Sequence, residues 1–157
     1  MSVAEDGDIT GEAGPAFSQD DLLDLTGYNM KRAYMRIYAD ISEALAGFDL
    51  RQRSFSVLSL VVANPEIRQS DIARELGIER SGTVVIVDEL EGRKLIRRAD
   101  VPGDRRAHAL TATRDGIALY RCALAEVDAR EGHLMNGFTA SERALLNALL
   151  RRIHELN

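Results

Sequence analysis

The stretch QSDIARELGIERSGTVVIVDELEGR, residues 69–93, carries the strongest structural signal in this chain. Its first part, residues 69–76, has the apolar spacing of a short helix, and Gly77 stands where a left-handed residue ends such a helix. A second helical pattern covers residues 80–93. A short helix, a tight turn and a longer helix predict a helix-turn-helix. The expected inward-facing residues are Ile72, Ala73 and Leu76 in the first helix, and Val84, Val87 and Leu90 in the second.

Directly after this stretch, the spacing of the apolar residues changes from the helical period to the alternation of a strand. Residues 95–99 and 107–111 read as two strands, and the Pro- and Gly-containing residues 100–106 connect them as a hairpin. Arg105 and Arg106 stand at the end of that connection, where they have no core to pack against. An isolated Arg-Arg pair would be read as solvated surface charge. After a helix-turn-helix, the same pair on a wing suits the negative potential of a narrow minor groove.

The first turn of the second helix carries groups that suit DNA. Arg80 offers a guanidinium, Ser81 and Thr83 offer hydroxyls, and the backbone amides around Gly82 can meet phosphate oxygens. The alternative is a helical hairpin that only packs, which the following wing disfavours. The predicted DNA contacts are Gln69, Ser70, Arg80, Ser81, Gly82, Thr83 and Val85, together with Arg105 and Arg106 in the wing.

Helices are also expected on both sides of this region. One long helix should run from Ser18 or Asp20 to Gly47, and a second should cover residues 51–63 before Asn64-Pro65. Thr113 should begin a long helix, and Thr139 with Glu142 has the spacing of a capping box for a last helix. The expected fold is mainly α with a small β-hairpin wing.

The last helix is apolar over a wider face than one packing partner would cover. A second subunit is the expected cover, because two-fold symmetric dimers fit paired half-sites on DNA. A broad internal core is the alternative. The apolar residues are Leu145, Leu146, Leu149, Leu150, Ile153 and Leu156.

Residues 50–116 resemble the MarR family of bacterial transcription regulators. The resemblance rests on the following segments: residues 55–58, 69–78, 80–81, 87–91, 95–98, 104–106 and 110–111. It implies a homodimer joined by N- and C-terminal helices, with a recognition helix in the major groove and a wing in the minor groove. It also implies a repressor released by an aromatic molecule, an acyl-CoA thioester or an oxidant. The expected division is a disordered acidic tail over residues 1–16, a dimerisation helix over 17–47, the winged helix-turn-helix over 48–112 and dimerisation helices over 113–157.

Three positions depart from the family pattern. Val84-Val85 replaces a frequent Thr-Arg pair, and valine cannot hydrogen-bond a base, although it can touch thymine methyl groups. Lys94 replaces a frequent glycine and would need a left-handed backbone.

Composition is compatible with DNA binding only when the charge is resolved along the chain. The net charge of the 157 residues is −5, but residues 1–25 hold seven acids and no lysine or arginine, so the remainder carries +2. Cys122 is the single cysteine, and no secretory signal or membrane-spanning run is evident, so a cytoplasmic location is expected. His108, His133 and His154 lack ligand spacing, and no metal or cofactor is expected.

A small-molecule site is harder to place. An arginine beside tyrosines and methionine suits an aromatic carboxylate or the phosphates of a thioester. The alternative is that the tyrosines only pack against neighbouring helices or a second subunit. The candidate ligand residues are Tyr28, Arg32, Met35, Arg36, Tyr38, Phe55 and His108.

Three functions compete at this point. A ligand-responsive regulator is favoured, and a protein–protein module or anti-regulator that keeps the fold without reading DNA is second. An enzyme comes last, because the sequence shows no Ser-His-Asp order, phosphate loop or metal cluster.

Overall fold

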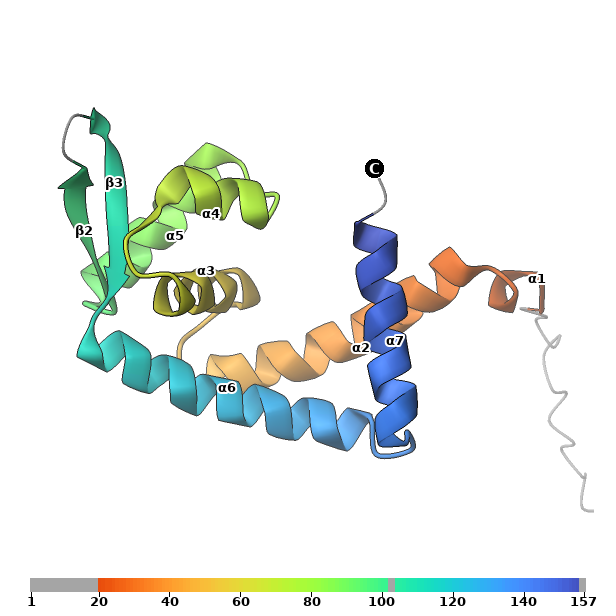
Figure 1. The fold of residues 1–157 in the computed structure, drawn as a ribbon. Helices are drawn as coiled ribbons and strands as arrows, with labels where there is room; N and C mark the ends of the chain where they lie inside the picture. The colour runs from red at the N-terminus through yellow and green to blue at the C-terminus, as the bar shows by residue number, and fades with distance from the viewer. Residues whose placement is uncertain (1–19, 102–103, 156–157) are drawn as a thin grey trace, which may run out of the picture. The chain divides into compact units, whose positions relative to one another are not determined.

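The structure is a computed structural model that describes residues 20–101 and 104–155, and of residues 100, 101 and 104–108 the backbone alone. The predicted acidic tail, residues 1–16, lies outside the described residues. The described residues divide into two compact units, the first ending at Tyr34 and the second beginning at Met35. The helices and strands, labelled in Figure 1, are α1 (Asp20–Leu23), α2 (Thr26–Ala46), α3 (Gln52–Ala63), β1 (Ile67–Arg68), α4 (Gln69–Glu75), α5 (Arg80–Gly92), β2 (Ile96–Val101), β3 (Asp104–Ala112), α6 (Arg114–Leu134) and α7 (Ala140–His154).

The first unit holds α1 and the beginning of α2. The prediction of one continuous helix to Gly47 is wrong, because the helix is interrupted at Asp24 and Leu25. The Asn29 side-chain amide donates to the Leu23 carbonyl at 2.6 Å and to the Leu25 carbonyl at 3.3 Å. The first bond satisfies the Leu23 carbonyl at the end of α1, which a continuous helix would have paired internally, while the Leu25 carbonyl also accepts from the Asn29 backbone amide at 3.1 Å.

The second unit contains the predicted helix-turn-helix and wing. Helices α4 and α5 form the helix-turn-helix, and β2 pairs with β3 antiparallel as the wing (Figure 1). Both strands are longer than predicted and leave a shorter connection between them. A further strand, β1, was not predicted: Ile67 pairs with Leu110 and Arg68 with Ala109, which gives the sheet order β1-β3-β2.

The core of this unit joins α3, α4, α5, α6 and the sheet. Its fully buried side chains include Leu58 of α3, Ile72 of α4, Leu90 of α5 and Leu110 of β3. The inner face of α5 consists of Thr83, Val87 and Leu90, all completely buried. The prediction that Val84 shares this face is wrong, since Val84 is 41% exposed. Positions four and three residues apart line the face, so it begins at Thr83.

The ends of the helices are fixed by local chemistry. Gly77 is left-handed with φ of 60°, as predicted, and Lys94 adopts the same φ despite its side chain. Thr113 caps α6, and Thr139 and Glu142 form the predicted capping box of α7. Hydrogen bonds from the Thr139 amide and hydroxyl lower the pKa of the Glu142 carboxyl.

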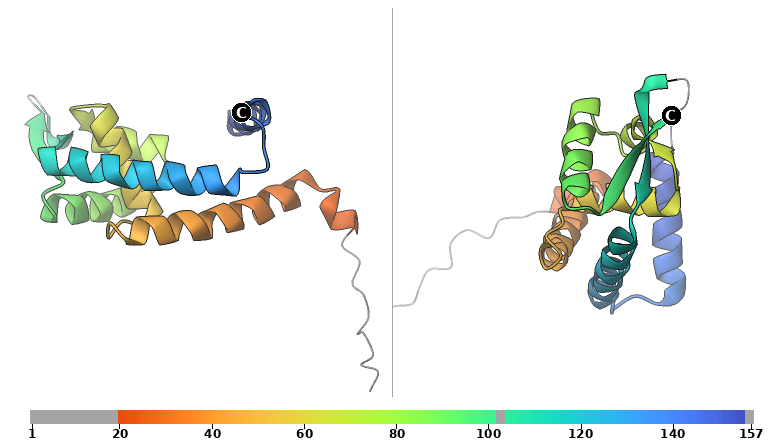
Figure 2. Two further views of the ribbon diagram at one scale, coloured as in Figure 1. Left: turned by 90° about the horizontal axis from the view of Figure 1, so that it is seen from below. Right: turned by 90° about the vertical axis from the view of Figure 1, so that its left-hand side faces the viewer.

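The two long helices that leave the winged helix run beside each other. Figure 2 shows α6 along the later part of α2, and the Arg130 guanidinium lies 3.8 Å from the Glu43 carboxylate. At the end of α5, the Arg93 guanidinium donates to the carbonyl groups of Phe48, at 3.0 Å, and Asp49. The end of α5 is therefore attached to the chain segment that follows α2.

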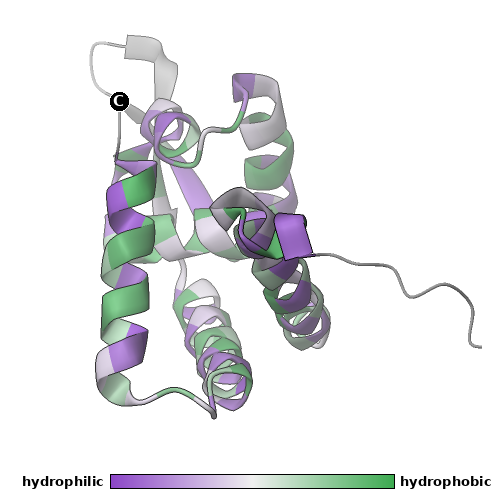
Figure 3. Cartoon of the chain, turned by 90° about the vertical axis from the view of Figure 1, so that its right-hand side faces the viewer, coloured by the Kyte–Doolittle hydropathy of each residue, from purple (hydrophilic) through white to green (hydrophobic). Residues whose placement is uncertain are grey.

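Helix α7 buries none of its residues. Figure 3 shows green, apolar segments along it, and Leu145 is 60% exposed. We call this face the α7 apolar stripe. Its residues are Leu145, Leu149, Leu150 and Ile153.

Candidate nucleic-acid interface

The outer face of α5 begins polar and becomes apolar. Arg80 and Ser81 are exposed in the first turn, and one turn later Val84 and Val85 are 41% and 66% exposed. Residues four apart share a helix face, so Arg80 precedes Val84 and Ser81 precedes Val85 along two adjacent rows. The first two turns thus present a guanidinium, a hydroxyl and two valine side chains together.

Two of the predicted contacts have other roles in this turn. The Thr83 side chain is completely buried, and its hydroxyl donates to the Glu79 carbonyl at 3.2 Å. The prediction that Thr83 offers a hydroxyl to DNA is therefore wrong for this structure. Gly82 is half-buried, and a Cβ there would lie 3.2 Å from the Ile78 side chain, so glycine keeps the start of α5 close to the turn.

The beginning of α4 adds further polar groups. Ser70 is exposed and Gln69 is half-buried at its N-terminus. Arg74, whose side chain is 77% exposed, pairs with Asp71 at 2.8 Å. An ion pair this exposed contributes little to stability, so Arg74 can meet an anion at small cost.

Near the tip of the wing, the structure describes the course of the backbone. Arg105 and Arg106 belong to β3, near its start, while their side chains lie outside the described residues. The register pairs Val101 with Asp104 at the end of the hairpin, with an irregularity between Asp100 and Val101. The backbone therefore places both arginines close to the tip of the wing.

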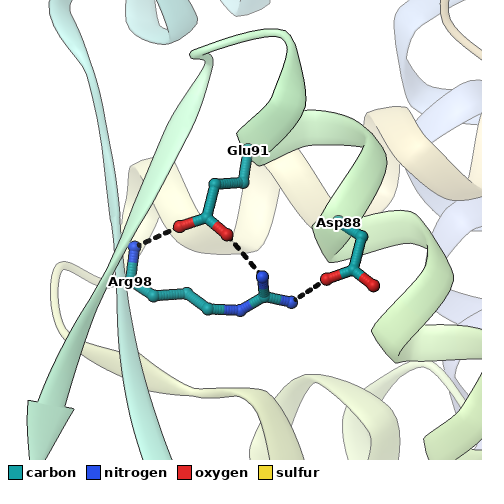
Figure 4. A network of polar contacts seen from close by, with 3 residues as sticks. All are labelled: Asp88, Glu91 and Arg98. Carbon is teal, nitrogen blue, oxygen red and sulfur yellow. Dashed lines mark hydrogen bonds and ion pairs between the residues drawn. The ribbon is translucent and has the colours of Figure 1, made fainter.

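An ion-pair network fastens the wing to α5. The Arg98 guanidinium of β2 contacts the Asp88 carboxylate at 2.5 Å and the Glu91 carboxylate, and the Arg98 amide donates to Glu91 at 3.1 Å (Figure 4). Burial of Arg98 acts against its charge, but the hydrogen bonds to Asp88 and Glu91 outweigh it and raise its pKa. Because the side chain of Arg98 is only 21% exposed, the network holds wing and helix at a fixed spacing.

Comparison of the chain with known proteins identifies the family to which it belongs. Residues 48–107 match the model of the MarR family. A crystal structure of a MarR-family transcriptional regulator from Rhodococcus sp. RHA1 is 30% identical, with a TM-score of 0.78, over 88% of this chain and 96% of that one. The chain belongs to the MarR family. It is a winged-helix transcriptional regulator of that family.

Two further MarR-like structures are informative. The transcriptional repressor CouR bound to a 23-mer DNA duplex is 37% identical, with a TM-score of 0.85, over 90% of this chain and all of that one. CouR from Rhodococcus jostii RHA1 bound to p-coumaroyl-CoA is 33% identical, with a TM-score of 0.78, over 87% and 96%. Repressors named CouR are therefore seen with DNA in one structure and with an acyl-CoA thioester in another.

The predicted ligand residues of this MarR-family chain are spread over both units. In the first unit, Arg32 donates to the Tyr28 hydroxyl at 3.1 Å and stacks 5.8 Å from its ring centre. In the second unit, Met35, Arg36 and Tyr38 are exposed on α2. Phe55 packs against Tyr120 with ring centres 5.5 Å apart, and the side chain of His108 lies outside the described residues.

A hollow of about 190 Å³ lies between the start of α3 and the turn of the helix-turn-helix. It includes none of the predicted ligand residues. Its lining residues are Gln52, Arg53, Ser56, Leu76, Gly77 and Ile78. Over the residues that the structure describes, no group of His, Cys, Asp and Glu could hold a metal ion, and no helix is long and apolar enough to span a membrane.

Arg98 is the functional residue that pattern reasoning missed. Two acids three residues apart on a recognition helix, followed by an arginine in the next strand, are a signal that could have found it. Its role leads to a prediction. Arg98→Met keeps most of the aliphatic stem but leaves Glu91 and Asp88 without their cation, so we expect the free energy of unfolding to fall by about 1–3 kcal/mol.

Urea denaturation measures this loss, and Arg97→Met is the matched control. Arg97 is the exposed neighbour on the same strand, and its substitution should change stability by less than about 0.5 kcal/mol. Equal effects of the two substitutions would show that the network does not hold the wing.

Proposed function

We propose that this MarR-family regulator is a repressor that binds palindromic operator DNA as a homodimer and is released by an aromatic or acyl-CoA effector. The observation that carries the proposal is the exposed face of Arg80, Ser81 and Val85 beside a wing that Arg98 holds in place. The DNA-bound CouR structure, 37% identical with a TM-score of 0.85, supports the same reading.

The DNA contacts divide into two groups. Helix α5 enters the major groove, where Arg80 and Ser81 reach base edges and phosphates. The Gly82 amide faces a phosphate of the DNA backbone. Ser70 and Gln69 at the start of α4 contact the flanking phosphates. Arg105 and Arg106 enter the adjacent minor groove from the wing.

The homodimer rests on the α7 apolar stripe. Four large apolar side chains at 39–60% exposure on one helix form the kind of patch that a protein partner covers. The partner is a second copy, because a two-fold dimer presents two recognition helices to two half-sites.

The effector is an aromatic acid or its coenzyme A thioester. Support comes from CouR bound to p-coumaroyl-CoA and from the cation–aromatic pairing of Arg32 with Tyr28. Guanidinium groups such as Arg32 and Arg36 suit the carboxylate or the phosphates, and the exposed Met35 and Tyr38 suit the aromatic part. Phe55 and His108 complete the proposed set.

Selection of bound sequences from random duplex DNA tests the proposal. We expect a palindrome whose half-sites lie about one helical turn, roughly 10 base pairs, apart. A featureless pool would contradict it.

Salt dependence gives a second measure of the same binding. The logarithm of the association constant should fall linearly with the logarithm of the salt concentration. If Arg80 contacts a phosphate, Arg80→Ala lowers the slope by about 1 for each half-site, whereas Arg121→Ala on the exposed surface of α6 leaves it unchanged. An unchanged slope with lower affinity would assign Arg80 to a base instead.

The effector class is tested separately by thermal shift and by release of operator DNA. Aromatic acids and their coenzyme A thioesters should raise the melting temperature, because a ligand that binds only the folded state stabilises it. The same compounds should weaken operator binding. A panel without any shift would overturn this effector class and leave DNA binding untouched.

A second candidate function is a protein–protein module with weakened DNA reading. The exposed Val84 and Val85 and the net charge of −5 favour it. Absence of duplex binding at low salt and micromolar protein would select this candidate over a repressor.

A further inference from the structure

The packing of α5 leaves Val84 and Val85 exposed. The helix already buries Thr83, Val87 and Leu90 completely, which fixes its rotation about its own axis. Residues 84 and 85 lie about 100° and 200° further round from Thr83, so they point outward while that face packs inward. Their exposure is therefore a fixed feature of the folded chain.

Folding stability does not explain two valines at these positions. A β-branched residue is a weaker helix former than the polar residues that usually cover an exposed helix face. An exposed valine also forgoes the stabilisation that its burial would bring. The two side chains are better explained by a surface that they cover when the protein binds.

The surface they fit is the floor of the major groove. Valine has no hydrogen-bonding atom, so it cannot read the edges of guanine, cytosine or adenine. The apolar group that the major groove offers is the 5-methyl group of thymine. Val84 and Val85 follow Arg80 and Ser81 by one turn on the same face, which puts them next to polar groups suited to bases and phosphates.

The next residue along this face is acidic, but its charge is compensated. Asp88 follows Val84 by one turn, and its carboxylate contacts the Arg98 guanidinium at 2.5 Å. Arg98 also pairs with Glu91. The ion pairs reduce the repulsion that two of the three carboxylates on α5 would exert on DNA phosphates. The third, Glu89, is exposed one turn after Val85.

We infer that Val84 and Val85 are specificity-determining residues that contact thymine 5-methyl groups in each operator half-site. The inference rests on the proposed DNA-binding function. The inference requires a thymine in each half-site opposite the middle of α5. The base or phosphate that Arg80 contacts should lie next to that thymine. Apolar contact replaces hydrogen bonding as the means of selecting these bases.

The test replaces thymine by deoxyuridine, which removes the methyl group and keeps the base pair. With the operator found by selection, each half-site thymine under α5 is replaced in turn, and binding is measured by fluorescence anisotropy. The wild-type chain should bind the deoxyuridine duplex about fourfold more weakly for each contacted methyl group, from the free energy of burying one such group. Replacement of thymine outside the half-sites should have no effect.

Val85→Ala and Arg80→Ala are the matched variants. The Val85→Ala chain should bind the thymine duplex several-fold more weakly and should lose most of the discrimination against deoxyuridine, because the two changes remove one shared contact. Arg80→Ala should weaken binding to both duplexes equally and keep the discrimination. Val84→Ala should show the Val85 pattern at a different thymine, and urea denaturation should show that all three variants are folded.

Each outcome decides the inference. Equal binding of thymine and deoxyuridine duplexes by the wild-type chain would overturn it and leave the proposed repressor function intact. The inference would also be overturned if, at every thymine, the loss of binding free energy from deoxyuridine simply added to the loss from Val85→Ala and to the loss from Val84→Ala. A wild-type chain that binds no duplex at low salt would overturn the proposed function, and this inference with it.

Discussion

Gly116→Ala is expected to lower the free energy of unfolding by about 3 kcal/mol or more. A Cβ at this position would lie 1.9 Å from the Leu95 carbonyl oxygen and 2.8 Å from its carbon. Both are backbone atoms and cannot rotate away. The Leu95 carbonyl accepts from the Thr113 amide at 2.9 Å, and the Thr113 hydroxyl accepts from the Gly116 amide at 3.0 Å. Relief of the clash therefore breaks the cap that begins α6.

Gly132→Ala is the control for Gly116→Ala, because it makes the same change in the same helix. Nothing lies within 4 Å of a Cβ at Gly132. Alanine is the better helix former, so this variant should be more stable by up to about 1 kcal/mol. Urea denaturation of both variants measures the difference. A Gly116→Ala chain as stable as the wild type would show that α6 and the α5–β2 turn are not in the close contact described.

Leu149→Glu in the α7 apolar stripe is expected to convert the proposed dimer into monomers. Leu149 is 43% exposed in the single chain, and a second copy that covers it would bury the new carboxylate without a partner charge. Operator affinity should fall by about 100-fold or more, because a monomer loses the gain from two linked half-sites. Sedimentation velocity measures the oligomeric state, and anisotropy measures the affinity.

Asn147→Glu is the control for Leu149→Glu. It places the same charge on the same helix, at an exposed position about 160° round from Leu149. This variant should remain dimeric and should bind the operator with the affinity of the wild type. A Leu149→Glu chain that stays dimeric would assign the subunit interface to another surface.

The apolar stripe also illustrates how far a pattern in the sequence carries. The spacing of Leu145, Leu149 and Ile153 predicted a face too wide for the chain's own core, and the structure leaves these side chains 43–60% exposed. The identity of the partner is a property of the assembly, which neither the pattern nor a single chain contains.

The features that depend on neighbours within one helical turn could be predicted from the residues alone. Gly77 ends α4 in a left-handed conformation, Thr113 caps α6, and Thr139 with Glu142 begins α7, all as predicted. Each is an interaction between residues three or four positions apart, so the residue types and their spacing contain the whole cause. The helix-turn-helix and the hairpin wing followed from the same local signals, and the family comparison agrees with them.

Which side chains face the core, the wing and solvent depends on how the folded segments pack together. It buries Thr83 and exposes Val84, pairs the two residues of β1 with β3, and brings Arg98 against Asp88 and Glu91. These outcomes depend on contacts between segments that lie apart in the chain. A helical period fixes the angles between side chains but not the rotation of the helix against its neighbours, and that rotation is set by the packing of the assembled core.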